Sequence, residues 1–305
     1  IHPVLIIATP PFLSIPREDV GTIILEHESR SAYKTISRPH FDLRTFVEIY
    51  ASKINAKFIM ADEMLRLETI GRKDIDNLHP LHPLSFRIDF AGDIKVFDKK
   101  KKEGKKFQIF NEASLEEINL ALKNKRNVFI FSLRKGLATM TICKDCNEII
   151  SCEECQAPLV LYLSHQGKKR MFVCNRCEKE ASGDTVCASC GSWNLMPLGI
   201  GTDTVYEEVK KLFSKEKILK LDKESAKTAS GAKKIVKEFE KTEGAILIGT
   251  EMAFFYLKKK VSLSVIASFD SLWSIPNFKI SEKIIQIILS VINTTKDIII
   301  IQTKN

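Results

Sequence analysis

The chain has 305 residues, of which 44% are hydrophobic and 28% charged, with a formal net charge of +9. This is an ordinary globular mixture that excludes a mainly disordered chain, and the length predicts two or three domains. The longest apolar runs fall short of the roughly 18–20 residues of a membrane span, and no secretory signal opens the sequence. We therefore expect a cytoplasmic protein without a membrane partner. Its positive charge favours a polyanionic partner, but weakly, because the basic residues are dispersed as well as clustered.

Apolar runs alternate with amphipathic segments, which is typical of an α/β protein with largely parallel strands. Up to residue 77 the sequence predicts strands at 4–8, 22–25 and 57–61, with a helix at 41–54. Prolines at positions 80 and 83 then indicate a linker at 78–84, because each proline removes a donor and restricts the residue before it.

A second α/β region follows the linker. Ser114, with Glu117 three residues later, predicts a serine cap on its first helix. A cysteine-rich stretch interrupts the pattern, so we expect an insertion between elements of one domain. The sequence predicts strands at 85–90, 94–98, 127–133, 217–222, 244–249, 264–270 and 297–303, and helices at 114–124, 202–213, 232–241 and 282–292.

All eight cysteines lie between Cys143 and Cys190, as four C-x2-C pairs. Each pair can direct two thiolates at one point, and tetrahedral Zn²⁺ takes four ligands at roughly 2.3 Å, so the pairs predict two zinc sites. Such sites are structural, since four thiolates leave no position for water, and they leave His165 no vacancy. A disulfide framework is the alternative, but the chain is too large to need one and has no secretory signal. Redox catalysis would need one pair rather than four.

The residues around the cysteines resemble one family. The segments 133–146 (LRKGLATMTICKDC), 190–213 and 244–252 (GAILIGTEM) are similar to primosomal protein N′, the superfamily 2 DNA helicase of bacterial replication restart. The segment GTIILEHESRSAYK (21–34) resembles that family's Asp-Glu-Glu-His motif and the Ser-Tyr-Lys after it. The match covers essentially the whole chain.

This resemblance implies a division of the chain and a set of metal ligands. Residues 1–77 would be a remnant of one RecA-like helicase lobe, 78–142 and 197–305 a second lobe, and 143–196 an inserted zinc module. The implied partners are forked or single-stranded DNA and primosome or single-strand-binding proteins. The implied ligands are nested: Cys143, Cys146, Cys187 and Cys190 for one zinc ion, and Cys152, Cys155, Cys174 and Cys177 for the other.

The motifs for ATP depart from the family pattern. No G-x-x-x-x-G-K-[ST] loop occurs, so we expect either that a longer protein was cut or that the gene product lacks this loop. In the acidic motif, Glu26 replaces the family's Mg²⁺-binding aspartate and His27 its catalytic glutamate, and a histidine is a poor substitute for a carboxylate that orients water. Glu26 and Glu28 are the candidates for Mg²⁺ binding and catalysis in this degenerate motif, in which Ser29 replaces the family's histidine. Residues 61–65 replace a Gly-Ser-Ala-Thr-Pro motif.

Two further motifs bear on ATP hydrolysis. Thr294 and Asp297 replace the two arginines of the family's last motif, which removes a cationic contribution to the transition state. Gly249 and Thr250 keep the family's Gly-Thr motif and are candidate nucleotide contacts.

We therefore interpret the chain as a 3′–5′ type helicase scaffold that keeps its fold, zinc module and DNA binding but hydrolyses ATP inefficiently. ATP and Mg²⁺ are implied by the resemblance, and the replaced motifs argue against their use. Two alternatives stay open: a divergent but working enzyme, and a non-catalytic zinc-dependent DNA-binding or primosome-interaction protein. A zinc-ribbon nucleic-acid enzyme of another family would require the Gly-Thr match to be a coincidence.

Candidate DNA contacts lie in and beside the cysteine-rich region. Basic side chains there, with Phe172 among them and Trp193 beyond, could contact the DNA backbone and stack on bases. The alternative is a solvated rim with both aromatic rings packed on the zinc core. We expect the lysine run at 98–107 to be a solvated hairpin turn and the histidines of the linker to be structural. The basic candidates are Arg134, Lys135, Lys168, Lys169, Arg170 and Arg176.

Overall fold

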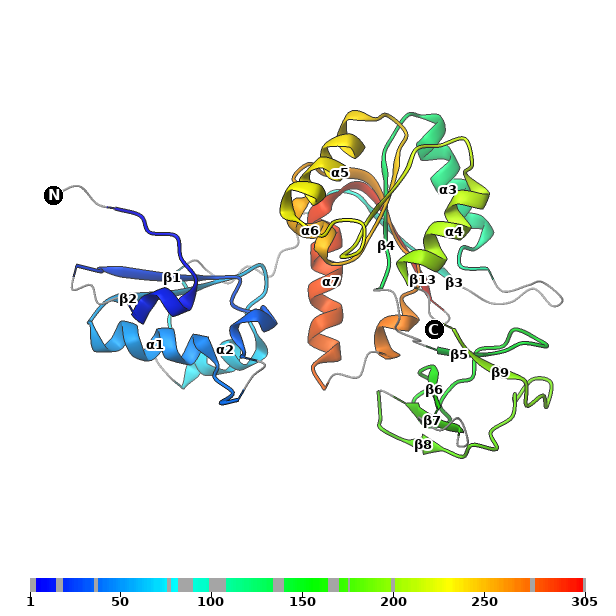
Figure 1. Ribbon diagram of the computed structural model, residues 1–305, viewed down its shortest axis with the longest axis horizontal. Helices are drawn as coiled ribbons and strands as arrows, with labels where there is room; N and C mark the ends of the chain where they lie inside the picture. Colours follow the sequence, from blue (N-terminus) through cyan, green and yellow to red (C-terminus); the bar gives the residue numbers. More distant parts are fainter. Residues whose placement is uncertain are drawn as a thin grey trace. The chain divides into compact units, whose positions relative to one another are not determined.

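Residues 1–86 and 87–305 form two separate units in a computed structural model (Figure 1). Among the residues described, no helix combines the length and the apolar character needed to cross a bilayer. The strand predicted at 85–90 and the hairpin turn predicted at 98–107 lie largely outside these residues. The structure describes residues 4–14, 19–35, 38–75, 78–81, 90–98, 108–133, 140–163, 170–174, 176–198, 201–274 and 278–303.

The first unit has a two-stranded parallel sheet, formed by β1 (Thr22–Glu26) and β2 (Lys57–Ala61). Helix α1 (Leu43–Lys53) connects them and packs Val47 and Ala51 on the inner side chains of β1. These three elements confirm the predicted ones. Shorter helices complete the unit: η1 (Pro10–Ser14), η2 (Ser31–Tyr33), α2 (Leu67–Gly71) and η3 (Arg72–Asp74).

The strand predicted at 4–8 is wrong. These residues form no regular element in the structure, and the side chains from Val4 to Ile7 are exposed. A strand needs a neighbour to take up its backbone hydrogen bonds, and the described residues supply none to this segment. Apolar, β-branched composition alone is therefore not sufficient to make this segment a strand.

The second unit is built on a six-stranded, fully parallel sheet with the order β10-β11-β4-β12-β13-β3. Every residue of the central strands β4 and β11 is buried, as expected of parallel strands covered on both faces. The predicted α/β class with mainly parallel strands is thus confirmed. The strands are β3 (Asp93–Asp98), β4 (Val128–Phe131), β10 (Ile218–Leu221), β11 (Ile246–Gly249), β12 (Val261–Ile266) and β13 (Thr295–Thr303).

Helices cover both faces of this sheet (Figure 1). Helices α3 (Glu112–Lys123) and α4 (Thr202–Leu212) pack on one face. The other face is covered by α5 (Ala229–Lys241), α6 (Met252–Tyr256) and α7 (Ile280–Thr294), and the short helix η4 (Asp270–Ser274) follows β12.

The predicted cap of α3 is wrong. The helix begins at Glu112, and the Asn111 side chain accepts a hydrogen bond from the Ser114 backbone N–H at 2.8 Å. Asparagine is as good a cap as serine, so the helix starts two residues before the predicted Ser114, which lies buried in the first turn. The strand predicted at 264–270 likewise begins earlier, at Val261, and ends at Ile266.

The cysteine-rich stretch is inserted between β4 and α4 and forms two small antiparallel sheets. Strand β5 (Met140–Cys143) pairs with β9 (Leu195–Leu198). Between them in the chain, β6 (Leu159–Leu163), β7 (Arg170–Cys174) and β8 (Glu180–Ala181) form a three-stranded sheet. Because β4 leads into this stretch, the stretch emerges at the carboxyl edge of the central sheet.

Candidate metal centres

The four C-x2-C pairs adopt one repeated backbone turn. In the first, the Asn147 N–H donates to the Cys143 carbonyl at 2.8 Å, and the Cys143 N–H donates to the Glu148 carbonyl at 2.8 Å. The same two hydrogen bonds recur at the pairs that begin with Cys152, Cys174 and Cys187. Each turn is therefore closed by its own backbone and holds two thiols on one side.

The residue after each pair has left-handed backbone geometry. Its φ is 59° at Asn147, 58° at Gln156, 62° at Glu178 and 70° at Gly191. Glycine and asparagine tolerate this region, whereas other residues lose roughly 1–2 kcal/mol there. The turn geometry could therefore have been predicted from Gly191 and Asn147, whereas the cysteine spacing alone does not predict it.

The turns bring the eight thiols into two groups of four. Within each group all Sγ atoms lie within 4.8 Å of one another. The groups are Cys143, Cys146, Cys187 and Cys190, and Cys152, Cys155, Cys174 and Cys177, which is the nesting that the family resemblance implied.

The geometry of the groups fits a metal ion better than disulfides. Neighbouring Sγ atoms are 3.3–3.6 Å apart, far beyond a disulfide bond of about 2.05 Å, and no cysteine is oxidised. Four sulfurs placed tetrahedrally at roughly 2.3 Å from a zinc ion would be about 3.8 Å apart. Each group therefore needs only a small adjustment to hold a metal ion.

The thiols of the first group differ in pKa. Burial raises the pKa of Cys143, but backbone N–H groups, among them that of Cys146, outweigh it and bring the pKa to about 7. The Ser192 N–H lowers the pKa of Cys190, yet hydrogen bonding with Cys146 and burial raise it to about 12. Metal binding at neutral pH must therefore displace protons from this group.

A small apolar core packs against the cysteines, and it includes Phe172, one of the two aromatic residues considered as DNA contacts. Phe172 is fully buried among Leu159, Leu161 and the cysteines, so its ring packs on this core. Trp193 is 73% exposed beside the first group. The structure therefore shows Phe172 packed on the core of the cysteine-rich module and not exposed for stacking on a base.

Of the six basic candidates, only Arg176 has a described side chain. Its guanidinium lies 4.6 Å from the ring centre of Trp273 in η4 and donates to the Cys155 carbonyl at 3.3 Å. This contact links the second cysteine group to the segment after β12. Arg134, Lys135, Lys168 and Lys169 lie outside the described residues, as do His82 and His165, and Arg170 begins β7.

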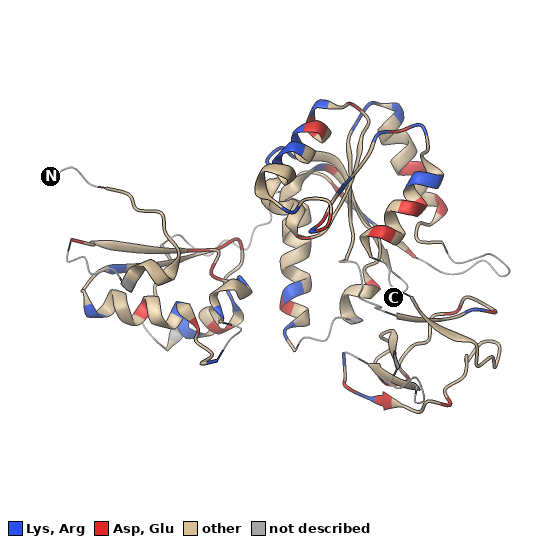
Figure 2. Cartoon of the chain, in the orientation of Figure 1, with Lys and Arg blue, Asp and Glu red and all other residues tan. Residues whose placement is uncertain are grey.

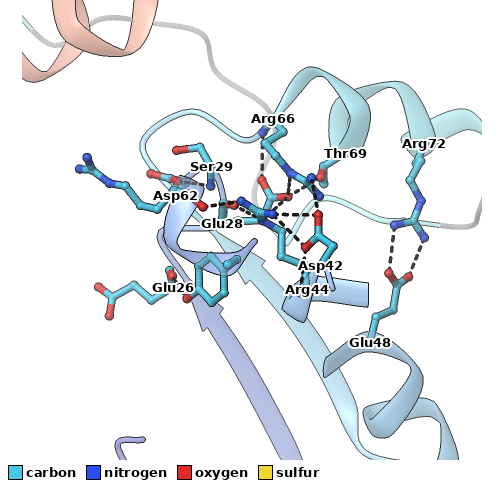
Figure 3. A network of polar contacts seen from close by, with 12 residues as sticks. Glu26, Glu28, Ser29, Asp42, Arg44, Glu48, Asp62, Arg66, Thr69 and Arg72 are labelled. Carbon is cyan, nitrogen blue, oxygen red and sulfur yellow. Dashed lines mark hydrogen bonds and ion pairs between the residues drawn. The ribbon is translucent and has the colours of Figure 1, made fainter. Parts of the chain in front are cut away.

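The acidic-motif residues of the first unit have separate surroundings (Figure 3). The Glu28 side chain is fully buried: Oε1 accepts from Arg66 Nε at 2.5 Å and Thr69 Oγ1 at 2.7 Å, and Oε2 accepts from the Arg66 N–H at 3.0 Å. Arg44 Nη1 donates to both carboxylate oxygens of Asp42, and Arg44 Nε lies 4.0 Å from Glu28 Oε1, so Arg44 joins Asp42 to the network. Both oxygens of Glu28 thus face protein donors.

Glu26 lies outside this network and its side chain is 80% exposed. Between the two glutamates, His27 has a φ of 56°, and its ring is 3.8 Å from the Asp62 carboxylate. The structure therefore does not bring Glu26 and Glu28 together as a pair, and sequence reasoning missed the partners Arg66 and Thr69.

Gly249 and Thr250 form the turn from β11 into α6. A Cβ on Gly249 would lie 2.8 Å from the Ala253 Cβ and 3.1 Å from the Phe129 ring, so close packing of α6 requires glycine. The Thr250 carbonyl accepts from the Ala253 N–H at 2.8 Å, and its N–H donates to the Leu221 carbonyl. This packing accounts for both residues without a nucleotide.

A carboxylate cluster that sequence reasoning missed lies at the carboxyl end of β10. Buried Asp222 accepts hydrogen bonds from Thr202 Oγ1 at 2.9 Å and the Ser225 N–H at 2.8 Å, with Lys220 Nζ at 3.3 Å. Burial raises the pKa of Asp222, but these donors outweigh it and the pKa is lowered. The cluster ties the start of α4 to the end of β10.

We expect Asp222→Asn to destabilise the second unit by about 1–3 kcal/mol at pH 7, because donors that now face a carboxylate lose their charged acceptor. A lowered pKa means that the stabilisation is fully present above the unfolded-state pKa of about 3.9 and is lost as pH falls through the folded-state pKa. Urea unfolding of both proteins between pH 7 and pH 3 checks this. A gap in unfolding free energy that stays constant over this range would contradict it.

Comparison with known proteins finds relatives that match most of the chain. No protein-family model matches the chain. It is 26% identical over 288 residues to replication restart protein PriA of Haemophilus influenzae, covering 94% of this chain and 39% of the relative. The PriA proteins of Chlamydia trachomatis (27% over 284 residues; 90% and 37% covered) and Bacillus subtilis (22% over 292 residues; 94% and 36% covered) are similar as well.

The chain spans about two-fifths of the length of these curated relatives. The similarity runs through both units and the cysteine-rich insertion, since it covers nine-tenths of the chain or more. The resemblance to the primosomal protein N′ family is therefore confirmed, and the chain is a divergent sequence relative of replication restart protein PriA.

Proposed function

We propose that the chain is a DNA-binding part of a replication-restart helicase of superfamily 2, held in shape by two structural zinc ions and hydrolysing ATP inefficiently. The observation that carries this proposal is the assembly of all eight cysteines into two four-thiol groups, in a chain similar to PriA over most of its length. The proposed site of action is the cytoplasm.

The order of the central sheet supports a RecA-like second lobe. Strand β4 lies between β11 and β12, and the chain crosses from one side of β4 to the other after β11. In open parallel sheets, ligands bind at the carboxyl ends of the strands beside such a switch. Thr250 and the start of the cysteine insertion lie at this edge. We assign 78–142 and 197–305 to this lobe, 143–196 to the zinc module and 1–77 to a remnant of the first lobe.

The cysteine groups have a mechanical role in this proposal. Four thiolates around each zinc ion would lock pairs of turns that are distant in sequence, and a bound zinc ion supplies only this cross-link, since no ligand position is left for substrate. The locked module would present exposed Trp193 for contact with an unpaired base. Forked or single-stranded DNA is the proposed ligand, and primosome or single-strand-binding proteins are the proposed partners.

The surroundings of Glu28 support inefficient hydrolysis. A carboxylate that orients water or Mg²⁺ needs a free oxygen, and both oxygens of Glu28 accept hydrogen bonds from protein groups. The same observation favours the second candidate function, a non-catalytic zinc-dependent DNA-binding or primosome-interaction scaffold.

ATP hydrolysis, measured with and without forked DNA, separates these candidates when it is combined with metal analysis and DNA titration. We expect two zinc ions per chain, salt-sensitive DNA binding to which the cysteine-rich module contributes only while metal is bound, and little DNA-stimulated turnover. Efficient DNA-stimulated turnover would overturn the assignment of impaired hydrolysis. Absence of DNA binding by the metal-loaded chain would overturn the proposed function as a whole.

A further inference from the structure

Seven lysines gather on the side of the second unit that α5 and α6 cover. Four are exposed on α5, and three follow one another in the loop after α6. Helix α6 packs against α5. We call this set the lysine face: Lys233, Lys234, Lys237, Lys241, Lys258, Lys259 and Lys260.

Most of this charge is not compensated by acidic groups. Lys259 Nζ lies 3.8 Å from the Glu240 carboxylate, which joins the loop to α5. Glu238, the other acidic residue of α5, pairs instead with Lys217 at 2.7 Å. Within the described part of the chain, the other six lysines have no acidic side chain within 4 Å. The lysine face therefore carries a concentrated positive potential.

The opposite side of the same sheet has the reverse balance. Helices α3 and α4 carry more acidic than basic side chains. Figure 2 shows basic residues predominating along α5, whereas acidic residues recur on the helices of the other face. The excess of charge is thus a property of one surface rather than of the whole unit. The charged residues of α3 and α4 are Glu112, Glu116, Glu117, Lys123, Asp203, Glu207, Glu208, Lys210 and Lys211.

The arrangement suits a regular array of phosphates. Lys233, Lys237 and Lys241 are spaced four residues apart, so they form a stripe along α5 with steps of about 6 Å. This step is similar to the distance between neighbouring phosphates along a nucleic-acid strand. Lysine is a flexible point charge that contacts phosphate without reading bases, and no arginine occurs between residues 223 and 260.

We infer that the lysine face binds the phosphate backbone of double-stranded DNA independently of sequence, as a contact separate from the cysteine-rich module. Duplex rather than single-stranded DNA is favoured because no aromatic residue lies on the exposed stripe of α5, where a single strand would need stacking partners. This inference rests on the proposed DNA-binding function and adds a second surface to it.

Matched triple substitutions in the full metal-loaded chain test the inference. The lysine-face variant is Lys233→Gln, Lys237→Gln and Lys241→Gln. The control variant removes the same charge from the opposite face by Lys123→Gln, Lys210→Gln and Lys211→Gln, all of them exposed on α3 or α4. Binding to a blunt duplex and to a single strand is titrated at several salt concentrations, and circular dichroism verifies that both variants are folded.

For the lysine-face variant we expect the slope of log K against log salt on duplex DNA to become shallower by about 2–3, since each lost phosphate contact removes about 0.9. Duplex affinity at low salt should fall on the order of tenfold or more, while single-strand binding changes less. Equal slopes for the two variants would overturn the inference and leave the proposed function intact.

Two other outcomes also decide the matter. If the native chain binds no DNA at all, the proposed function and this inference both fail. If the native chain binds polyglutamate more tightly than duplex DNA, and only the lysine-face variant loses that binding, the surface is one for acidic protein segments and the inference is overturned.

Discussion

Replacing Cys187 by serine is expected to reduce the bound metal from two ions to one per chain and to unfold the cysteine-rich insertion locally. Cys187 is 1% exposed, its Sγ lies 3.4 Å from that of Cys146, and the two come from pairs more than 40 residues apart. A serine hydroxyl does not ionise at neutral pH, so the group keeps three thiolates. Structural zinc contributes about 10–16 kcal/mol to the folding of such small domains.

The size of this effect follows from how little else holds the insertion together. Its core consists of the cysteines and a few apolar side chains around Phe172, on short strands of two to five residues. So small a core does not offset the conformational entropy of the loops that join it. The central sheet has its own large core and should stay folded.

Metal analysis by mass spectrometry and hydrogen exchange across residues 140–198 measure this result. Glu178→Gln is the control, because Glu178 is an exposed residue of a cysteine turn whose carboxylate is no ligand. We expect the control to keep two ions and native exchange protection. Two retained ions in Cys187→Ser, or full protection after chelation, would show that the thiol groups do not stabilise the insertion through metal.

Much of this architecture could be predicted because its causes are local in sequence. The buried runs at 246–249 and 128–131 have the short β-branched and aromatic character of central parallel strands, and the amphipathic periods of α4 and α5 are unambiguous. The four C-x2-C pairs likewise predict thiol groups from spacing alone. Their nested pairing did not follow from the spacing and came from the family resemblance.

What could not be predicted depends on distant partners. The environment of Glu28 is set by Arg66 and Thr69, which are 38 and 41 residues away. Asp222 similarly depends on Thr202, and Arg176 on Trp273. The strand predicted at 4–8 was wrong because it too depends on a distant partner: among the described residues, no strand pairs with this segment. Local pattern fixes the element type, while side-chain function depends on tertiary contacts.

Glu28→Gln is expected to destabilise the first unit by about 3–5 kcal/mol, because it removes the negative charge that compensates Arg66 and Arg44 in a buried network. Asp42 would remain as the only carboxylate in contact with the two arginines among the described residues. The network joins β1, α1 and α2, so its loss should loosen all three elements. Hydrogen exchange resolved on β1 and β2 is the suitable measurement, since both tryptophans of the chain lie in the second unit.

Glu26→Gln is the matched control and separates structure from catalysis. Glu26 belongs to the same motif but its side chain is largely exposed, so the change in unfolding free energy should stay within about 0.5 kcal/mol. If Glu28 is held in place to stabilise the unit, only Glu28→Gln changes exchange protection, and ATP turnover is low in all three proteins. If Glu28→Gln were as stable as Glu26→Gln and abolished a DNA-stimulated turnover present in the native chain, Glu28 would be a catalytic residue. Its hydrogen bonds to Arg66 and Thr69 would then have to open during the reaction.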